Sequence, residues 1–364
     1  MSLIQDLFQT YGPVYLERFG DNIPEAHRQV IEAIAGCRTG NFGTHVFQCP
    51  DCCQVHIANS SCGNRHCPIC QAEKSRKWLD RQIDNLLPCS YFMLTFTVPA
   101  ELRGFLRSHQ KAGYEALFQA SSQALKCLAA NQRFVGCHQA GFCGVLHTWG
   151  RTLTYHPHIH YIVPGGGLDR ELSRWLPSKP DFFVHVKPLS LLFRSLFRKQ
   201  MQKAGLIGQI SPKVWNREWV VNSQPVGNGK SSMKYLAPYV FRVAISNNRI
   251  LNIERGKVRF RYRKSGAHRW RSMQLDAIEF IRRFLQHVLP KGFMKIRHFG
   301  FLSPNARVSI QRVRELICVL YELLGKVITV RTTTPKFRPL LCTACGAVMR
   351  WQTFIPPGAC LTGG

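Results

Sequence analysis

The sequence predicts an α+β fold in which an antiparallel sheet follows a cysteine-rich domain and precedes a helical region. Short β-rich segments interleave with helical ones, and strands joined by short connections must pair as antiparallel hairpins. Cysteines, histidines and glycines crowd into residues 36–72, where helical periodicity stops. We therefore divide the chain into a cysteine-rich domain at 1–87, a sheet-containing domain at 88–265 and a helical C-terminal region at 266–364.

The charge of the chain indicates its class of partner. The 364 residues include 49 Lys and Arg against 20 Asp and Glu, a formal net charge of +29. Such an excess favours a polyanionic partner, above all nucleic acid, although charge alone leaves a generally adhesive or ribosome-associated protein open. We see neither an apolar run long enough for a membrane span nor a secretory leader, so we expect a cytoplasmic, nucleoid-associated protein.

Helices are predicted on both sides of the cysteine-rich block. Residues 1–35 place apolar side chains at mixed three- and four-residue spacing, and residues 73–87 (EKSRKWLDRQIDNLL) read as a basic helix. Four basic residues in or beside this helix are suited to phosphate contact: Arg65, Lys74, Arg76 and Lys77.

Strands and helices alternate through the rest of the chain. Residues 91–98 form a β-rich run closed by Pro99, which predicts a central strand, and a long helix follows over 102–130. The β-like segments 144–149 and 158–163 have a short connection, which predicts an antiparallel hairpin. The other predicted elements are strands at 182–186 and 218–222, helices at 190–204, 275–289 and 308–324, a short helix around 235–239, and a hairpin at 249–262.

Two Cys-x-x-Cys pairs predict a structural zinc site. Cys49 and Cys52 are separated from Cys67 and Cys70 by residues 53–66, which is close to zinc-ribbon spacing, and four thiolates complete a tetrahedron around Zn²⁺. In a chain without an export signal, clustered cysteines favour metal ligation over disulfides. A closed four-ligand site is structural, so we expect this domain to hold its shape and contact nucleic acid rather than catalyse.

Additional cysteines and histidines leave the ligand set open. Four further residues could supply a second tetrahedral site or exchange into the first: Cys37, His45, Cys62 and His66. Near the C-terminus, Cys342 and Cys345 form another pair with only Cys360 as an obvious thiol neighbour, which amounts to half a site.

The segment 156–163 (HPHIHYIV) predicts a metal centre on a strand. Alternate side chains of a strand share a face, so His158 and His160 point the same way, about 7 Å apart, while the residues between them face the core. Two such imidazoles can converge on one divalent ion. A third ligand is needed, and His156 has the right parity. We prefer His147, which would oppose His160 if the numbers of paired residues sum to about 307.

A pair of tyrosines supplies candidate nucleophiles. Tyr235 and Tyr239 lie four residues apart and would share one face of a helix. A tyrosyl oxygen can attack phosphorus and conserve the bond energy as a phosphotyrosine ester, and two side by side could hold two ends in turn. Lys234 and Arg242 are available to bind phosphate, whereas a packed aromatic pair is the alternative interpretation.

Together these motifs resemble the two-tyrosine rolling-circle transposases of bacterial insertion sequences, within the HUH endonuclease superfamily. The resemblance follows the chain in order through 61–71 (SCGNRHCPICQ), 146–150 (LHTWG), 156–166 (HPHIHYIVPGG), 235–240 (YLAPYV) and 296–302 (IRHFGFL). Each segment is modest alone, but five in order are specific. Family members often have Gln after the Trp-Gly pair, where this chain has Arg151.

The resemblance implies a palm-like antiparallel sheet, the HUH nuclease palm, in which His158 and His160 bind Mg²⁺ or Mn²⁺. It implies that Tyr235 and Tyr239 form 5′-phosphotyrosine links and free a 3′-hydroxyl. The substrates would be single-stranded DNA at the element ends and target DNA. We see no helicase segment, so strand separation would come from host replication or helicase factors or from superhelical tension.

Two other functions remain open on the sequence. A plasmid replication initiator or conjugative relaxase would use the same chemistry, although the zinc block and the 296–302 motif favour a transposase. A non-enzymatic zinc-dependent DNA-binding protein would use the histidine and tyrosine pairs only for packing, and predicts binding without cleavage.

Overall fold

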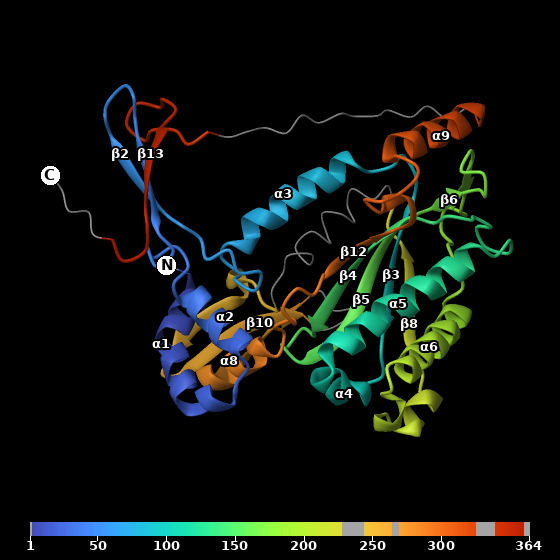
Figure 1. Cartoon of the computed structure of the whole chain (residues 1–364), viewed down its shortest axis with the longest axis horizontal. Helices are drawn as coiled ribbons and strands as arrows, with labels where there is room; N and C mark the ends of the chain where they lie inside the picture. Colours follow the sequence, from blue (N-terminus) through green and yellow to red (C-terminus); the bar gives the residue numbers. More distant parts are fainter. Residues whose placement is uncertain (1, 228–243, 264–268, 325–338, 360–364) are drawn as a thin grey trace.

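A five-stranded antiparallel sheet is the largest sheet among the residues that the structure describes. The computed structural model describes residues 2–227, 244–263, 269–324 and 339–359 (Figure 1). The strand order is β12-β4-β5-β3-β8, and every neighbouring pair is antiparallel. The strands are β3 (Tyr91–Thr97), β4 (Phe142–Trp149), β5 (Tyr155–Pro164), β8 (Val220–Pro225) and β12 (Ile296–Phe299). The α+β class and the β4–β5 hairpin are confirmed.

One face of this sheet is buried beneath helices (Figure 1). Every second residue of β3, from Phe92 to Phe96, is fully buried, as the two-residue period of a strand requires. The covering helices are α4 (Leu102–Ser108), α5 (Gln110–Ala129) and α6 (Val186–Lys203). On β5, buried residues alternate with the partly accessible His158 and His160, so the two histidines lie on the opposite face.

Two predicted elements differ from the structure. The strand predicted at 182–186 is wrong, because Phe183 and Val184 are buried in the main core without strand pairing and the segment leads into α6 at Val186. A short apolar run shows only that the segment is buried. The helix predicted at 102–130 is interrupted at His109, whose ψ of 48° lies outside helical geometry.

A second core joins the N-terminal helices to a much later part of the chain. α1 (Leu3–Phe19) and α2 (Glu25–Ala35) share this core with α8 (Ala277–Leu285) and an antiparallel sheet of order β11-β10-β9. Its strands are β9 (Ile250–Glu254), β10 (Lys257–Arg263) and β11 (Trp270–Asp276). The rings of Phe8 and Phe284 meet edge-on at 5.2 Å between centroids. The hairpin was predicted, whereas β11 was missed because it is mostly exposed and polar.

Two helices frame the histidine-bearing side of the molecule. α3 (Gln71–Asp84) runs from the cysteine-rich region toward α9 (Ile310–Leu323) (Figure 1). Arg314 on α9 donates hydrogen bonds to the carbonyl oxygens of Asp84 at 3.0 Å and Leu86 at 3.5 Å, which ties α9 to the end of α3.

A small sheet brings the two ends of the chain together (Figure 1). Its order is β13-β1-β2, all antiparallel, with β1 (Thr44–Gln48), β2 (Val55–Asn59) and β13 (Arg350–Ile355). The remaining elements are strands β6 (Gly166–Leu168) and β7 (Trp175–Pro177) and the 3₁₀ helices η1 (Gly20–Asn22), η2 (Ile207–Gln209), η3 (Pro212–Asn216), η4 (Asn247–Arg249) and η5 (Gly300–Leu302). Within the described residues, every helix is too short or too polar to cross a membrane.

Candidate functional site

Three histidines from two adjacent strands converge on the face of the main sheet that is opposite to α4, α5 and α6. One ligand nitrogen from each of His147 on β4 and His158 and His160 on β5 lies within 4.8 Å of the others. Their ring centroids are 4.8 to 5.3 Å apart. Three nitrogen atoms at this separation can hold one divalent ion, with further positions open for water or a phosphate oxygen.

The register that brings His147 into this group differs from the prediction by two residues. His147 pairs with His158 rather than with His160, and Val145 lies opposite His160. The turn is tighter than expected, because the amide of Gly150 donates to the carbonyl of Thr154 at 2.7 Å. A shift of two residues preserves the face, so His147 still points toward the other two imidazoles.

Hydrogen bonds orient the rings of His158 and His160. The Nδ1–H of His158 donates to the carbonyl oxygen of His156 at 2.7 Å. Because a carbonyl only accepts, Nδ1 carries the proton and Nε2 keeps its lone pair for a metal. Nδ1 of His160 lies 2.9 Å from the hydroxyl of Thr95, its register partner on β3. Thr95 is a functional neighbour that the sequence analysis missed, and only the pairing of β3 with β5 reveals it.

Electrostatics keep these imidazoles neutral. Burial, followed by the nearby ring of His160, holds the pKa of His158 well below its usual value. Burial alone lowers the pKa of His160 to about 4. A neutral imidazole is the form that ligates a metal, so both of these rings are in the ligating form at neutral pH.

An aromatic and cationic layer backs the third histidine. The ring of Trp149 stacks on that of His147 at 5.0 Å and 26°. The ammonium of Lys295 lies 4.8 Å from the centre of the Trp149 ring, in cation–π geometry. Burial lowers the pKa of Lys295 to about 7. This contact fixes the indole, and through it the orientation of His147.

The predicted nucleophiles lie outside the described residues. Tyr235 and Tyr239, and the flanking Lys234 and Arg242, fall in the segment 228–243. Their place relative to the three histidines therefore stays a prediction.

A cavity opens on the same face of the sheet as the three histidines, none of which lines it. It has a volume of about 520 Å³ and is lined in part by Ile162, two residues after His160 on β5, and by Cys143 on β4. Arg307 also lines it, as does His298, whose pKa is lowered by burial.

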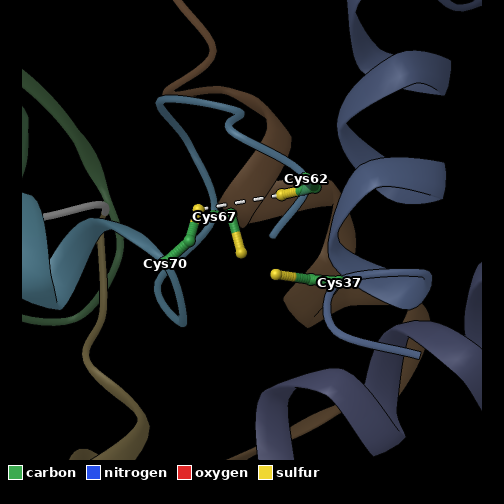
Figure 2. A group of neighbouring side chains, drawn as sticks. All are labelled: Cys37, Cys62, Cys67 and Cys70. Atoms are coloured by element: carbon green, nitrogen blue, oxygen red, sulfur yellow. Dashed lines mark hydrogen bonds between the residues drawn. The ribbon is translucent and has the colours of Figure 1, made fainter. Parts of the chain in front are cut away.

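The first cysteine group is part of the second core (Figure 2). It consists of Cys37 after α2, Cys62, Cys67 and Cys70 at the start of α3, with all four sulfur atoms within 4.8 Å of one another. The sulfur atoms of Cys62 and Cys70 are 3.8 Å apart. Hydrogen bonds from the neighbouring thiols of Cys62 and Cys67 lower the pKa of Cys70 and favour its thiolate. Four sulfur atoms in this arrangement match tetrahedral Zn²⁺.

The expected grouping of the two Cys-x-x-Cys pairs around one ion is wrong. Cys67 and Cys70 join Cys37 and Cys62, whereas Cys49 and Cys52 join the C-terminal Cys342 and Cys345. Spacing alone favoured the nearer pair, because the partner of Cys49 and Cys52 lies about 290 residues away in sequence. The expectation that Cys342 and Cys345 form half a site is corrected accordingly.

The two candidate histidine ligands of the cysteine-rich domain have other partners. Nε2 of His66 accepts a hydrogen bond from the amide of Leu289 at 3.3 Å, and burial lowers the pKa of His66 to about 3. Nδ1 of His45 accepts from the indole N–H of Trp351 at 3.3 Å. Both lie outside the metal groups found among the described residues.

The predicted phosphate-binding residues divide into two kinds. The guanidinium of Arg65 donates to the carbonyl oxygens of Pro290 at 2.7 Å and Phe293 at 2.6 Å, which gives it a structural role that the sequence did not indicate. Lys74 and Lys77 are exposed on α3. The side chain of Arg76 lies outside what the structure describes.

Two family models match the chain. One, described as "Putative transposase", covers residues 141–309 and includes the three histidines. The other, described as "Transposase zinc-binding domain", covers residues 7–98 and includes the whole first cysteine group. No solved structure matches the chain significantly.

Two relatives are similar over most of their length. The "Putative transposase y4qJ" of Sinorhizobium fredii (strain NBRC 101917 / NGR234) is 38% identical over 336 residues, covering 86% of this chain and 84% of the relative. The "Transposase for insertion sequence element IS801" of Pseudomonas savastanoi pv. phaseolicola is 27% identical over 364 residues, covering 90% of this chain and 83% of the relative. The chain therefore belongs to the two-tyrosine family of insertion-sequence transposases that carry an N-terminal zinc-binding domain.

Proposed function

We propose that this transposase cleaves and rejoins single-stranded DNA through 5′-phosphotyrosine intermediates, in transposition of the rolling-circle type. The observation that carries the proposal is the convergence of His147, His158 and His160 on one face of the main sheet. Tyr235 and Tyr239 would be the matching nucleophiles, a role that the family resemblance implies for them. The substrates are single-stranded DNA at the element ends and the target DNA, with host replication or helicase factors as partners at the nucleoid.

The three imidazoles would hold Mg²⁺ or Mn²⁺, and the arrangement of their nitrogen atoms fits such an ion. The bound ion would polarise the scissile phosphate and offset the charge that develops during displacement. The ligand set consists of imidazoles alone, and nitrogen ligands favour a transition-metal ion. Of the two ions, we therefore expect Mn²⁺ to support the higher activity.

The protein's own residues would carry the covalent chemistry. The phenolic oxygen of one tyrosine attacks phosphorus, the new O–P bond forms as the P–O3′ bond breaks, and the freed 3′-oxygen takes up a proton. The strand then remains attached through its 5′-phosphate. In the joining step, a 3′-hydroxyl attacks the phosphorus of that ester. A new P–O3′ bond forms as the bond between phosphorus and the tyrosyl oxygen breaks, and the phenol takes up the proton. The strands are thus joined without ATP.

A covalent-adduct assay tests this mechanism. Purified protein, Mn²⁺ and labelled single-stranded oligonucleotides from the element ends should give a species that survives denaturing electrophoresis. Replacement of both nucleophiles (Tyr235→Phe with Tyr239→Phe) should abolish the adduct, and His158→Ala should lower its yield by about a hundredfold or more. His138→Ala, a change at an exposed histidine away from the metal centre, is the matched control and should leave the yield unchanged.

Measuring DNA binding alongside DNA cleavage distinguishes the proposed transposase from the two alternative functions. Retained DNA binding with no wild-type adduct would favour a non-catalytic DNA-binding protein. Adduct formation on a plasmid origin but not on element ends would favour a replication initiator or relaxase.

A further inference from the structure

We propose that a second structural Zn²⁺ site, formed by Cys49, Cys52, Cys342 and Cys345, fastens the C-terminal end of the chain to its N-terminal domain. All four sulfur atoms lie within 4.8 Å of one another. The shortest separations are 3.3 Å between Cys49 and Cys345 and 3.5 Å between Cys52 and Cys342. We call this group the terminal clasp. It is independent of the DNA-cleaving function proposed above.

The backbone forms two matching metal-binding turns. The amide of Cys53 donates to the carbonyl of Cys49 at 3.1 Å, and the amide of Gly346 donates to that of Cys342 at 2.9 Å. Each turn has a left-handed residue immediately after its second cysteine, with φ of 57° at Cys53 and 79° at Gly346. Both pairs therefore adopt the same tight turn, which points two sulfur atoms toward one centre.

After each turn the chain reverses direction and pairs with the segment before the turn. The amide of Cys49 donates to the carbonyl of Gln54 at 2.9 Å, and the amide of Cys342 donates to that of Ala347 at 2.8 Å. The chains continue into β1 and β2 on one side and β13 on the other, and β1 pairs with β13 along its length. Two turns on paired strands form a zinc ribbon whose halves come from opposite ends of the sequence.

The chemistry of the four ligands favours zinc. A tetrahedral set of four thiolates is typical of Zn²⁺. The backbone amides of Cys345 and Ala344 donate hydrogen bonds to the sulfur of Cys342. The alternative to zinc binding is that the same four cysteines form disulfide bonds.

The small apolar content around the clasp indicates why a metal is needed. Its buried core comprises Cys49, Cys342 and Met349, with Phe47 and Ala347 packed against it. Trp351, by contrast, is 57% exposed. A core of this size does not hold a strand by itself, and small lobes of this kind are usually stabilised by metal or disulfides.

Zinc content measured on the full chain tests the clasp. Elemental analysis of the wild type should give two zinc ions per chain. The double variant Cys342→Ser with Cys345→Ser should give one, whereas Cys127→Ser with Cys318→Ser should keep two, because neither of those cysteines belongs to a metal group. A single zinc in the wild type, or two in the Cys342/Cys345 variant, would overturn the proposal.

Thiol labelling of the wild type provides a test that requires no variant. Cys52 and Cys345 are exposed, as is Cys127, so geometry alone would allow all three to react. With zinc bound, Cys52 and Cys345 should resist alkylation while Cys127 reacts at once, and a strong chelator should remove the protection. Protection that persists with chelator and disappears with a reductant would show disulfides in place of zinc. If the wild type binds two zinc ions but forms no covalent adduct with DNA, the proposed cleavage function is wrong and the terminal clasp is unaffected.

Discussion

At the scale of single residues, the metal centre depends on atoms that hold the imidazoles in place. His158 is oriented by a backbone carbonyl, which a side-chain change leaves in place. His160 is oriented by the hydroxyl of Thr95, which can be removed. Loss of the side chain that hydrogen-bonds to a metal-ligating histidine typically lowers the metal affinity by about 10- to 100-fold.

We predict that Thr95→Val lowers the affinity for Mn²⁺ about tenfold, because valine keeps the shape of threonine and loses the hydrogen bond to Nδ1 of His160. Titration calorimetry measures the affinity. Thr95→Ser retains the hydroxyl and should restore most of it. Equal affinities for the valine and serine variants would show that the hydroxyl does not position His160.

A second residue-scale prediction concerns the turn after β12. Gly300 has φ of 59°, and a Cβ atom there would overlap the carbonyl oxygen of Ala140. Gly292 has φ of 74° but open space around it. Gly292→Ala should therefore lower the free energy of unfolding by about 1–2 kcal/mol through backbone strain alone. Gly300→Ala should cost clearly more in urea denaturation, and similar costs for both would refute the steric argument.

At the scale of elements, α3 is the best candidate for a DNA-contacting helix. It runs between the first cysteine group, where Cys70 precedes its first residue, and α9 (Figure 1). Its Lys74 and Lys77 are exposed to solvent. A rigid helix anchored at both ends holds its lysines at fixed spacing, which suits phosphate contact.

Removal of the two charges should weaken DNA binding in a salt-dependent way. Lys74→Gln with Lys77→Gln should reduce the slope of log affinity against log salt by roughly 1.4 for single strands, because each lost phosphate contact contributes roughly 0.7. Fluorescence anisotropy at several salt concentrations measures the slope. Lys187→Gln with Lys199→Gln on α6 changes the net charge equally, so the same reduction in that control would disprove a specific role for α3.

Sequence analysis predicted elements wherever local periodicity decides them. The alternation in β5 placed His158 and His160 on one face, and an even register shift left His147 on the same side. It failed where contacts between residues far apart in sequence decide the structure. The choice of Cys37 and Cys62 as partners of Cys67 depends on how α2 packs, and no spacing rule encodes that packing.

At the scale of the whole molecule, the two cysteine groups differ in what they support. Cys37, Cys67 and Cys70 are buried within the second core, which joins α1 and α2 to α8. The terminal clasp, by contrast, supports only the small β13-β1-β2 sheet, and two of its four cysteines are exposed.

We therefore expect Cys67→Ser to lower the thermal midpoint of global unfolding much more than Cys342→Ser. Loss of a buried zinc ligand removes the metal from a core, whereas loss of the clasp frees a local sheet. Circular dichroism melting curves provide the comparison, with Cys127→Ser as the exposed control. A larger effect for Cys342→Ser would show that the clasp supports the global fold.

Because β1 pairs with β13, the zinc ribbon can assemble only after both ends of the chain have been synthesised. Cys52 leaves the ribosome 290 residues before Cys342. At about 5–20 residues per second, the first half of the ribbon waits roughly 15–60 s for the second. A polypeptide that terminates before β13 never receives that second half, so only translation products that include Arg350–Ile355 can add β13 to β1.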